Sequence, residues 1–194
     1  QRILPAFALF LRLTKELGKC YTVLYNGPMC GASAPDHLHF QAGDKRFLPV
    51  DNEYTSLKLF HGKLIAERTH LRAYAIERYL RNFVAFESAD EQVLSAAFEI
   101  FYRALQARSG SLEEPMMNLL CVYEDDAWRL IMFPRAKHRP SFYFRDAESG
   151  ILISPAAVDL GGVCIAPLAR DFSKIRKEDI IEMYEEVSLP TDMF

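Results

Sequence analysis

The sequence predicts an α+β fold in which helices pack on an antiparallel sheet. Three observations favour this class: strand-like runs come in neighbouring pairs, amphipathic helical segments lie between the pairs, and no internal repeat or long linker divides the 194 residues. A chain of this length can bury one sizeable core. We therefore expect residues 1–194 to form one domain. Because the chain does not begin with Met, we also expect it to be a piece of a longer protein.

The first helix is predicted over 3–17, where apolar residues run up to Gly18, a residue type that commonly ends helices. The β-branched and aromatic run 20–25 is typical of a strand. A loop rich in Gly, Pro and Ser follows over 26–36. The alternation of polar and apolar residues over 37–42 predicts the partner strand.

The middle of the chain is expected to hold a further strand and a long helix. The strand is predicted over 58–67, whereas 71–87 mixes residue types and leaves helix and strand open. Ser88 and Glu91 form the S-x-x-E capping box, and Gly110 ends the helix that they begin. One face of this helix is predicted to pack in the core: Val93, Leu94, Phe98, Phe101, Tyr102 and Leu105.

The last third predicts a hairpin, a second strand pair and a closing helix. The hairpin joins 118–124 to 128–134 through Asp125 and Asp126. Two short apolar runs, 142–145 and 151–154, suggest further strand pairing. The closing helix is expected over Lys177 to Val187, with Ile180, Ile181, Tyr184 and Val187 in the core and Pro190 after it.

Composition indicates an ordinary soluble protein. The net charge of −3 gives no bulk attraction to nucleic acid or to an anionic membrane. No apolar run reaches the roughly 18 residues that a membrane-spanning helix needs. The scattered cysteines, Cys20, Cys30, Cys121 and Cys164, form no C-x-x-C pair, so we expect reduced thiols and a cytoplasmic location.

The most informative stretch runs from Asn26 to Gln41 and reads NGPMCGASAPDHLHFQ. If the end of this stretch is a strand, His37, His39 and Gln41 share one face, while Leu38 and Phe40 face the core. Two imidazoles and an amide on one strip are costly to bury without partners, so this face is expected to line a site. The alternative is a satisfied polar strip on a solvent-facing strand.

An imidazole in this position can attack phosphorus and form a covalent intermediate, provided that an acceptor holds its other ring nitrogen. Gln41 can donate to a phosphate oxygen without ionising. The turn of Gly31, Ala32 and Ser33 can present backbone N–H groups and a hydroxyl to the same phosphate. Asn26 is either a turn residue or a phosphate or ribose contact, and the sequence leaves both readings open.

The pattern N-G-x(3)-G-A-S-x(3)-H-x-H-x-Q resembles the active-site segment of the transferase branch of the histidine-triad superfamily. That branch includes galactose-1-phosphate uridylyltransferase, diadenosine tetraphosphate phosphorylase and GDP-L-galactose phosphorylase, and 37–41 most resembles the last. Residues 25–43 also resemble an uncharacterised bacterial family assigned to the superfamily. The resemblance implies a histidine-triad-like sheet that lacks the strands preceding the first helix of the full fold.

The resemblance further implies a nucleotidyltransferase or nucleotide phosphorylase in which His39 becomes nucleotidylylated. His37 would support the site and Gln41 would contact the transferred phosphate. The substrate would be a nucleoside diphosphate sugar or a dinucleoside polyphosphate, with phosphate as a further partner. Members of the branch often form homodimers, and no feature of this sequence decides whether this chain does.

Two alternatives remain: a nucleotide hydrolase of the same superfamily, and a non-catalytic nucleotide-binding regulatory module. The hydrolase branch has a third histidine where this chain has Gln41, which argues against the former. No cofactor is predicted. No third Cys, Asp or Glu ligand stands at a spacing that would complete a metal site with His37 and His39, so no metal is predicted either.

A basic cluster over 135–139 offers a second set of candidate phosphate ligands. Arg135, Lys137 and Arg139 could clamp substrate phosphates, or they could form a solvated charged face. The loop 154–162 resembles one in which relatives carry an acidic residue, here Asp159, which we interpret as structural. Cys30 is interpreted as a bystander of the candidate site.

Overall fold

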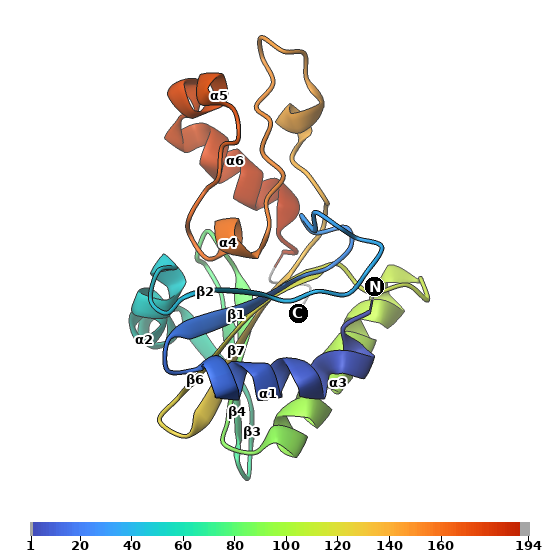
Figure 1. The fold of residues 1–194 in the computed structure, drawn as a ribbon, viewed down its shortest axis with the longest axis vertical. Coiled ribbons are helices and arrows are strands. Elements are labelled where there is room, and N and C mark those ends of the chain that lie inside the picture. Colours follow the sequence, from blue (N-terminus) through green and yellow to red (C-terminus); the bar gives the residue numbers. More distant parts are fainter. Residues whose placement is uncertain (1, 191–194) are drawn as a thin grey trace.

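The computed structural model describes residues 2–190, and its centre is a seven-stranded antiparallel sheet (Figure 1). The strand order is β2-β1-β6-β7-β5-β4-β3, with every neighbouring pair antiparallel. The strands are β1 (Tyr21–Asn26), β2 (Gln41–Asp44), β3 (Gly62–Arg68), β4 (Leu71–Ile76), β5 (Phe83–Ser88), β6 (Met117–Glu124) and β7 (Ala127–Pro134). The helices are η1 (Leu4–Ala6), α1 (Phe7–Leu17), α2 (Pro49–His61), α3 (Glu91–Ser109), η2 (Ser141–Phe144), α4 (Ala157–Leu160), α5 (Ala169–Lys174) and α6 (Lys177–Val187). The predicted α+β class, with helices packed on an antiparallel sheet, is confirmed.

Helices cover both faces of the sheet, which gives two cores. The first core lies between the sheet and helices α1 and α3. The second lies between the sheet and helices α2 and α4 and also includes side chains of α6. Alternation along the strands divides the side chains: Leu119 and Cys121 of β6 enter the first core, and Leu120 enters the second. Burial on both faces explains why β6 and β7 read as continuous apolar runs.

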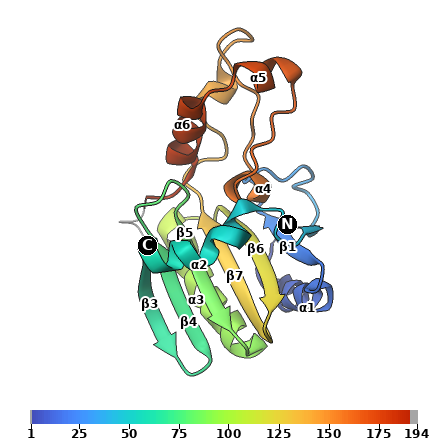
Figure 2. The same ribbon diagram turned by 90° about the vertical axis from the view of Figure 1, so that its left-hand side faces the viewer.

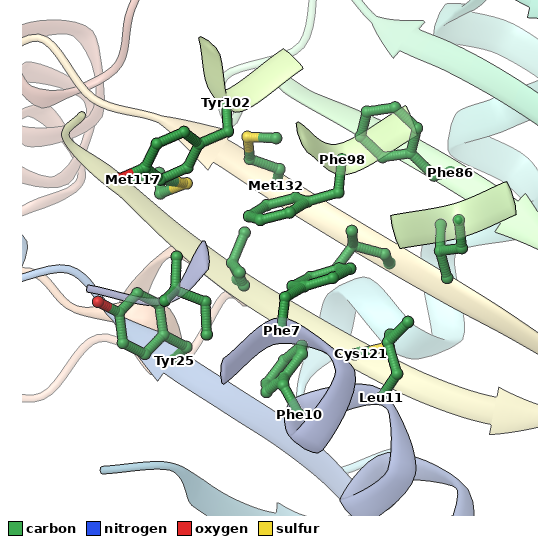
Figure 3. Close-up of a cluster of buried hydrophobic side chains, with 14 of the residues drawn as sticks. Phe7, Phe10, Leu11, Tyr25, Phe86, Phe98, Tyr102, Met117, Cys121 and Met132 are labelled. Atoms are coloured by element: carbon green, nitrogen blue, oxygen red, sulfur yellow. The ribbon is translucent and has the colours of Figure 1, made fainter. Parts of the chain in front are cut away.

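Aromatic rings fill the first core (Figure 3). The rings of Phe7 and Phe98 stack with centroids 3.8 Å apart and join α1 to α3. Phe40, which precedes β2, packs against this core, and its ring lies 5.2 Å from that of Phe10. The candidate site segment is therefore anchored to the core by one of its own side chains.

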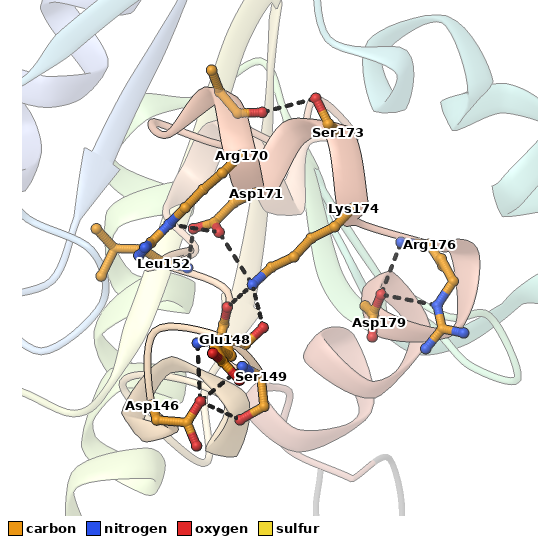
Figure 4. Close-up of polar contacts among 12 residues, drawn as sticks. Asp146, Glu148, Ser149, Leu152, Arg170, Asp171, Ser173, Lys174, Arg176 and Asp179 are labelled. Carbon is orange, nitrogen blue, oxygen red and sulfur yellow. Dashed lines mark hydrogen bonds and ion pairs between the residues drawn. The ribbon is translucent and has the colours of Figure 1, made fainter.

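A lobe formed by 135–190 extends beyond one end of the sheet (Figures 1 and 2). It contains little regular structure besides its helices, and polar contacts hold its loops (Figure 4). The buried carboxylate of Asp171 accepts a hydrogen bond from the backbone N–H of Leu152 at 2.7 Å. Lys174 donates to the backbone carbonyl oxygens of Glu148, at 3.2 Å, and Gly150. These bonds fasten α5 to the 146–152 turn.

Several predicted elements are confirmed. Helix α1 ends at Leu17, and α6 spans Lys177–Val187 as expected, although Ile180 and Ile181 are only half-buried and Met183 takes a core position. Asp125 and Asp126 turn the β6–β7 hairpin with φ of 51° and 59°, the left-handed values that a tight hairpin turn needs.

Three predictions in the middle of the chain need correction or completion. The predicted strand 58–67 is wrong over its first four residues, because α2 continues to His61 and β3 begins at Gly62. The undecided stretch 71–87 forms the two strands β4 and β5. Asp90, rather than Ser88, caps α3: its carboxylate accepts from the backbone N–H groups of Gln92 and Val93, while Ser88 ends β5. The expected end of α3 at Gly110 is confirmed by a left-handed φ of 65°.

The strand pair predicted over 142–145 and 151–154 is also wrong. The first run forms the 3-10 helix η2, and the second has no regular structure. Phe142, Ile151 and Ile153 are buried in the second core without joining the sheet, whereas Phe144 and Leu152 are exposed. Burial and β-pairing favour the same residue types, so composition alone could not separate them.

None of the helices formed by residues 2–190 has both the length and the apolar character that crossing a bilayer requires. All four cysteines are free thiols.

Candidate active site

The motif residues lie where β1 ends, the connecting loop turns and β2 begins. The predicted strand over 37–42 is wrong for residues 37–40, because the β1–β2 ladder begins only at Gln41, opposite Leu24. Phe40 packs inward as expected, whereas Leu38 is 36% exposed and does not enter the core. The two histidines therefore sit on an extended linker at the end of the sheet, which leaves His37 exposed and His39 half-buried.

The two imidazoles are neighbours, with ring centroids 5.4 Å apart. The Nδ1 of His39 lies 3.2 Å from the backbone carbonyl oxygen of His37. Since a carbonyl oxygen can only accept, Nδ1 of His39 carries the proton and, in the neutral ring, Nε2 holds the free lone pair. The side chain of His37 faces the exposed carboxylate of Asp36, with Nδ1 3.2 Å from Oδ1.

The loop between the strands packs against the lobe at Gly31. This glycine has φ of +81°, and a Cβ built on it would lie 2.7 Å from both the Cβ of Ala156 and the carbonyl oxygen of Pro155. The left-handed backbone conformation and the close approach of Pro155 and Ala156 therefore both require glycine at this position. Beyond it, Ala32 is half-buried and Ser33 is exposed at the surface of the loop.

Asn26 links the motif to the rest of the sheet. Its Oδ1 accepts hydrogen bonds from Nδ2 of Asn118 and from the backbone N–H of Ala157, each at 2.7 Å. Its Nδ2 donates to Oε1 of Gln41 at 3.1 Å. Of the two readings left open for Asn26, neither describes this role: the side chain is a buried junction between β1, β2, β6 and α4.

Asn118 is the residue that sequence reasoning missed. It is fully buried and is the direct cross-strand partner of Asn26. Besides Asn26, its Nδ2 donates to the backbone carbonyl oxygen of Cys30 at 2.7 Å and so holds the site loop. The signal was present, since a lone amide in an otherwise apolar strand must find partners.

The basic cluster does not converge on one ligand site. Neither reading of Arg135, as a phosphate clamp or as part of a solvated face, fits the structure, because the side chain is 5% exposed and its N–H donors are engaged within the protein. The acceptors are Asn118 Oδ1 at 2.7 Å and the carbonyl oxygens of Pro155 at 3.0 Å, Val187 at 3.2 Å, Lys137 at 3.1 Å and His138 at 3.0 Å.

The other two basic candidates are nearer the surface. Lys137 pairs with Glu186 at 2.8 Å. Arg139 donates to Oγ of Ser154 at 3.0 Å and lies 4.2 Å from the ring centroid of Tyr143. Ser154 directly precedes the Pro155–Ala156 segment that touches Gly31, so Arg139 belongs to the part of the lobe that borders the site loop.

Comparison with known protein families shows to which family the chain belongs. A profile described as "GDPGP1-like, C-terminal domain" matches residues 55–194, which is more than half of the chain. The chain belongs to this GDPGP1-like family. Residues 1–44 match a second profile, described as a domain of unknown function, DUF4922.

The candidate site draws on both matched segments. Asn26, the 31–33 turn, the two histidines and Gln41 lie in the DUF4922 segment. Asn118, Arg135 and Ala156 lie in the GDPGP1-like segment. The hydrogen bonds of Asn26 therefore join the two segments within one site.

Among solved structures, the chain is similar to the crystal structure of a DUF4931 family protein from Bacillus cereus ATCC 10987. The two are 18% identical with a TM-score of 0.47, and the match covers 68% of this chain and 63% of that chain. The GDPGP1-like chain thus spans less than two thirds of that protein. No curated protein sequence matches it.

Two side chains near the candidate site, those of Asp159 and Cys30, have structural roles. The buried carboxylate of Asp159 accepts from the backbone N–H groups of Ala156 and Ile165, each at 2.8 Å, which fits the structural role expected for it. Cys30 is fully buried, and burial raises the pKa of its thiol to about 12. It is therefore not a reactive thiolate at neutral pH.

Among residues 2–190, no group of three or more His, Cys, Asp or Glu side chains is arranged to hold a metal ion.

Proposed function

We propose that the protein is a nucleotidyltransferase or nucleotide phosphorylase that works through a covalent nucleotidyl-His39. The observation that carries the proposal is the hydrogen bond from Nδ1 of His39 to the carbonyl oxygen of His37. It leaves Nε2 as the nucleophilic nitrogen on a half-exposed ring. Membership of the GDPGP1-like family supports the same class of reaction.

In the first step, Nε2 of His39 attacks the α-phosphorus of a nucleoside diphosphate sugar or dinucleoside polyphosphate. A P–N bond forms, and the P–O bond to the leaving group breaks; this group is a sugar phosphate for the first substrate and a nucleoside polyphosphate for the second. The imidazolium that results keeps its Nδ1–H hydrogen bond to the carbonyl oxygen of His37, and this bond stabilises the positive charge. In the second step, an oxygen of inorganic phosphate or of a phosphorylated acceptor attacks the phosphorus, the P–N bond breaks and neutral His39 returns.

Gln41 stabilises the charge that develops on the transferred phosphate. Its Oε1 is occupied by Asn26, so the amide NH₂ is the end directed away from that junction. Backbone N–H groups of the 31–33 turn and the hydroxyl of Ser33 assist it. A single preorganised donor of this kind contributes about 3 kcal/mol to transition-state stabilisation. Lys137 and Arg139 bind the leaving or entering phosphate group.

The test is covalent labelling. The full-length protein is incubated with α-³²P-labelled GDP-sugar, ADP-glucose, UDP-glucose and diadenosine tetraphosphate, and the labelled peptide is mapped. We expect acid-labile, base-stable label on His39 that disappears in His39→Ala. The matched control is His70→Asn, since His70 is an exposed histidine with φ of 64°, which Asn tolerates.

Three other outcomes are informative. Full labelling of His39→Ala would remove His39 as the nucleophile. Label that forms and passes to water in the presence of phosphate and sugar phosphates would establish a hydrolase. Nucleotide binding without label from any donor would establish a binding module.

A further inference from the structure

A line of hydrogen bonds runs from Arg135 through two asparagine side chains to Gln41. The guanidinium of Arg135 donates to Oδ1 of Asn118 at 2.7 Å. Nδ2 of Asn118 donates to Oδ1 of Asn26 at 2.7 Å, and Nδ2 of Asn26 donates to Oε1 of Gln41 at 3.1 Å. Every link points the same way, from the cation toward the motif.

The first three members of the line are shielded from water. Asn118 is 0% exposed, Arg135 is 5% exposed and Asn26 is 7% exposed. In such surroundings, hydrogen bonds in a chain polarise one another, and a guanidinium stays charged. Each amide that accepts at its oxygen becomes a stronger donor at its nitrogen. The line therefore ends in the NH₂ group of Gln41, two residues from His39.

We infer that Asn118 and Asn26 are positioning residues that fix the orientation of the Gln41 amide and transmit the charge of Arg135 to it. Gln41 then presents its donor end, strengthened, to the phosphate that His39 receives. This inference rests on the proposed function. It explains how a buried arginine without a substrate contact can favour an anion at the site, and why Asn118 occupies an apolar strand.

The substitution Asn118→Asp tests the direction of the line. Its carboxylate still accepts from Arg135 but cannot donate to Oδ1 of Asn26. The carboxylate then repels Oδ1 of Asn26, which the backbone N–H of Ala157 still holds, so the Asn26 amide is displaced and its hydrogen bond to Oε1 of Gln41 is lost. We expect the rate of His39 labelling to fall by about 100-fold, the loss typical of one missing preorganised donor.

A double-mutant cycle separates positioning from general damage. In a Gln41→Ala background, Asn118→Asp should slow labelling much less than in the wild type, because only the hydrogen bond from Asn118 to the Cys30 carbonyl oxygen is left to lose. Equal losses in both backgrounds would overturn the inference. Cys121→Ala is the matched control: Cys121 is buried on the same strand but faces the first core, so its loss should lower Tm without changing the labelling rate.

A second readout does not depend on activity. In ¹⁵N-labelled full-length protein, the side-chain NH₂ resonances of Asn26 and Gln41 should shift in Asn118→Asp and stay in place in Cys121→Ala. An unchanged Gln41 resonance in Asn118→Asp would overturn the inference even if the wild type is labelled. If no donor labels the wild type, the proposed function fails, and the resonances still decide whether the line orients Gln41.

Discussion

The side chain of Ala156 occupies the space that a side chain at Gly31 would need, with the two Cβ positions only 2.7 Å apart. Gly31 also has φ of +81°. We therefore expect Gly31→Ala to lower the free energy of unfolding by about 2 kcal/mol or more and to displace the 31–33 turn from the lobe. Denaturant unfolding and the rate of His39 labelling measure the two effects.

Gly110→Ala is the control for this substitution. Gly110 also has a left-handed φ, of 65°, but a Cβ there meets nothing within 4 Å. The cost should be about 1 kcal/mol, from backbone strain alone, with no effect on labelling. Equal effects of the two substitutions would show that the contact with Ala156 does not shape the site.

His37→Ala should be far milder than His39→Ala. The acceptor that orients His39 is the backbone oxygen of residue 37, which the substitution keeps. We expect labelling to slow by less than about 10-fold, a smaller loss than a general acid–base group would give. Quench-flow measurement of the labelling rate checks this, and loss of labelling as complete as in His39→Ala would assign the His37 side chain a direct role.

Asp90→Ala should lower the free energy of unfolding by about 1 kcal/mol, because the carboxylate caps two backbone N–H groups at the start of α3. Glu91→Ala, one residue later, should be nearly neutral, since Asp90 and not Ser88 is the cap. Chemical denaturation of both variants compares them. A larger loss of unfolding free energy in Glu91→Ala than in Asp90→Ala would support the capping box predicted from Ser88 and Glu91.

Glu186 ties the basic segment to α6, and hydrogen bonds from Lys137 and Ser141 lower its pKa. A carboxyl whose folded pKa lies below its unfolded value stabilises the protein above the unfolded pKa, near 4.3, and loses this contribution as pH falls through the folded pKa. Glu186→Gln should therefore cost about 1 kcal/mol at pH 7 and nothing near pH 2. Denaturant unfolding of both proteins at pH 7 and near pH 2 tests the sign of this pH dependence. A cost that is independent of pH would contradict it.

Local chemistry predicted the elements with sharp boundaries. The Asp125–Asp126 turn, the end of α3 at Gly110 and the span of α6 follow from residues next to one another in the chain. The wrong strand predictions lie where tertiary packing, rather than local sequence, determines the backbone conformation. Ile151 and Ile153 are buried without joining a sheet, and His37 to Phe40 lie outside the β1–β2 ladder although their alternation is strand-like.

For the candidate site, too, the sequence carried local information but not contacts between distant residues. The motif predicts roles for His39 and Gln41 from spacing within a short segment, and these roles stay predictions. It could not show that Arg135 faces inward, since a buried arginine and a surface arginine look alike in sequence. Nor could it pair Asn118 with Asn26, which lie 92 residues apart in the chain.

The interlocking of β1 with β6 bears on how this chain can be dissected. Residues 1–44 and 55–194 match separate family profiles, yet β1 lies between β2 and β6 within one sheet, and α1 shares a core with α3. Expression of 55–194 alone would bare the β6 edge together with the apolar groove that α1 fills. Such a fragment should aggregate, and mixing it with a 1–44 peptide should recover solubility by strand complementation.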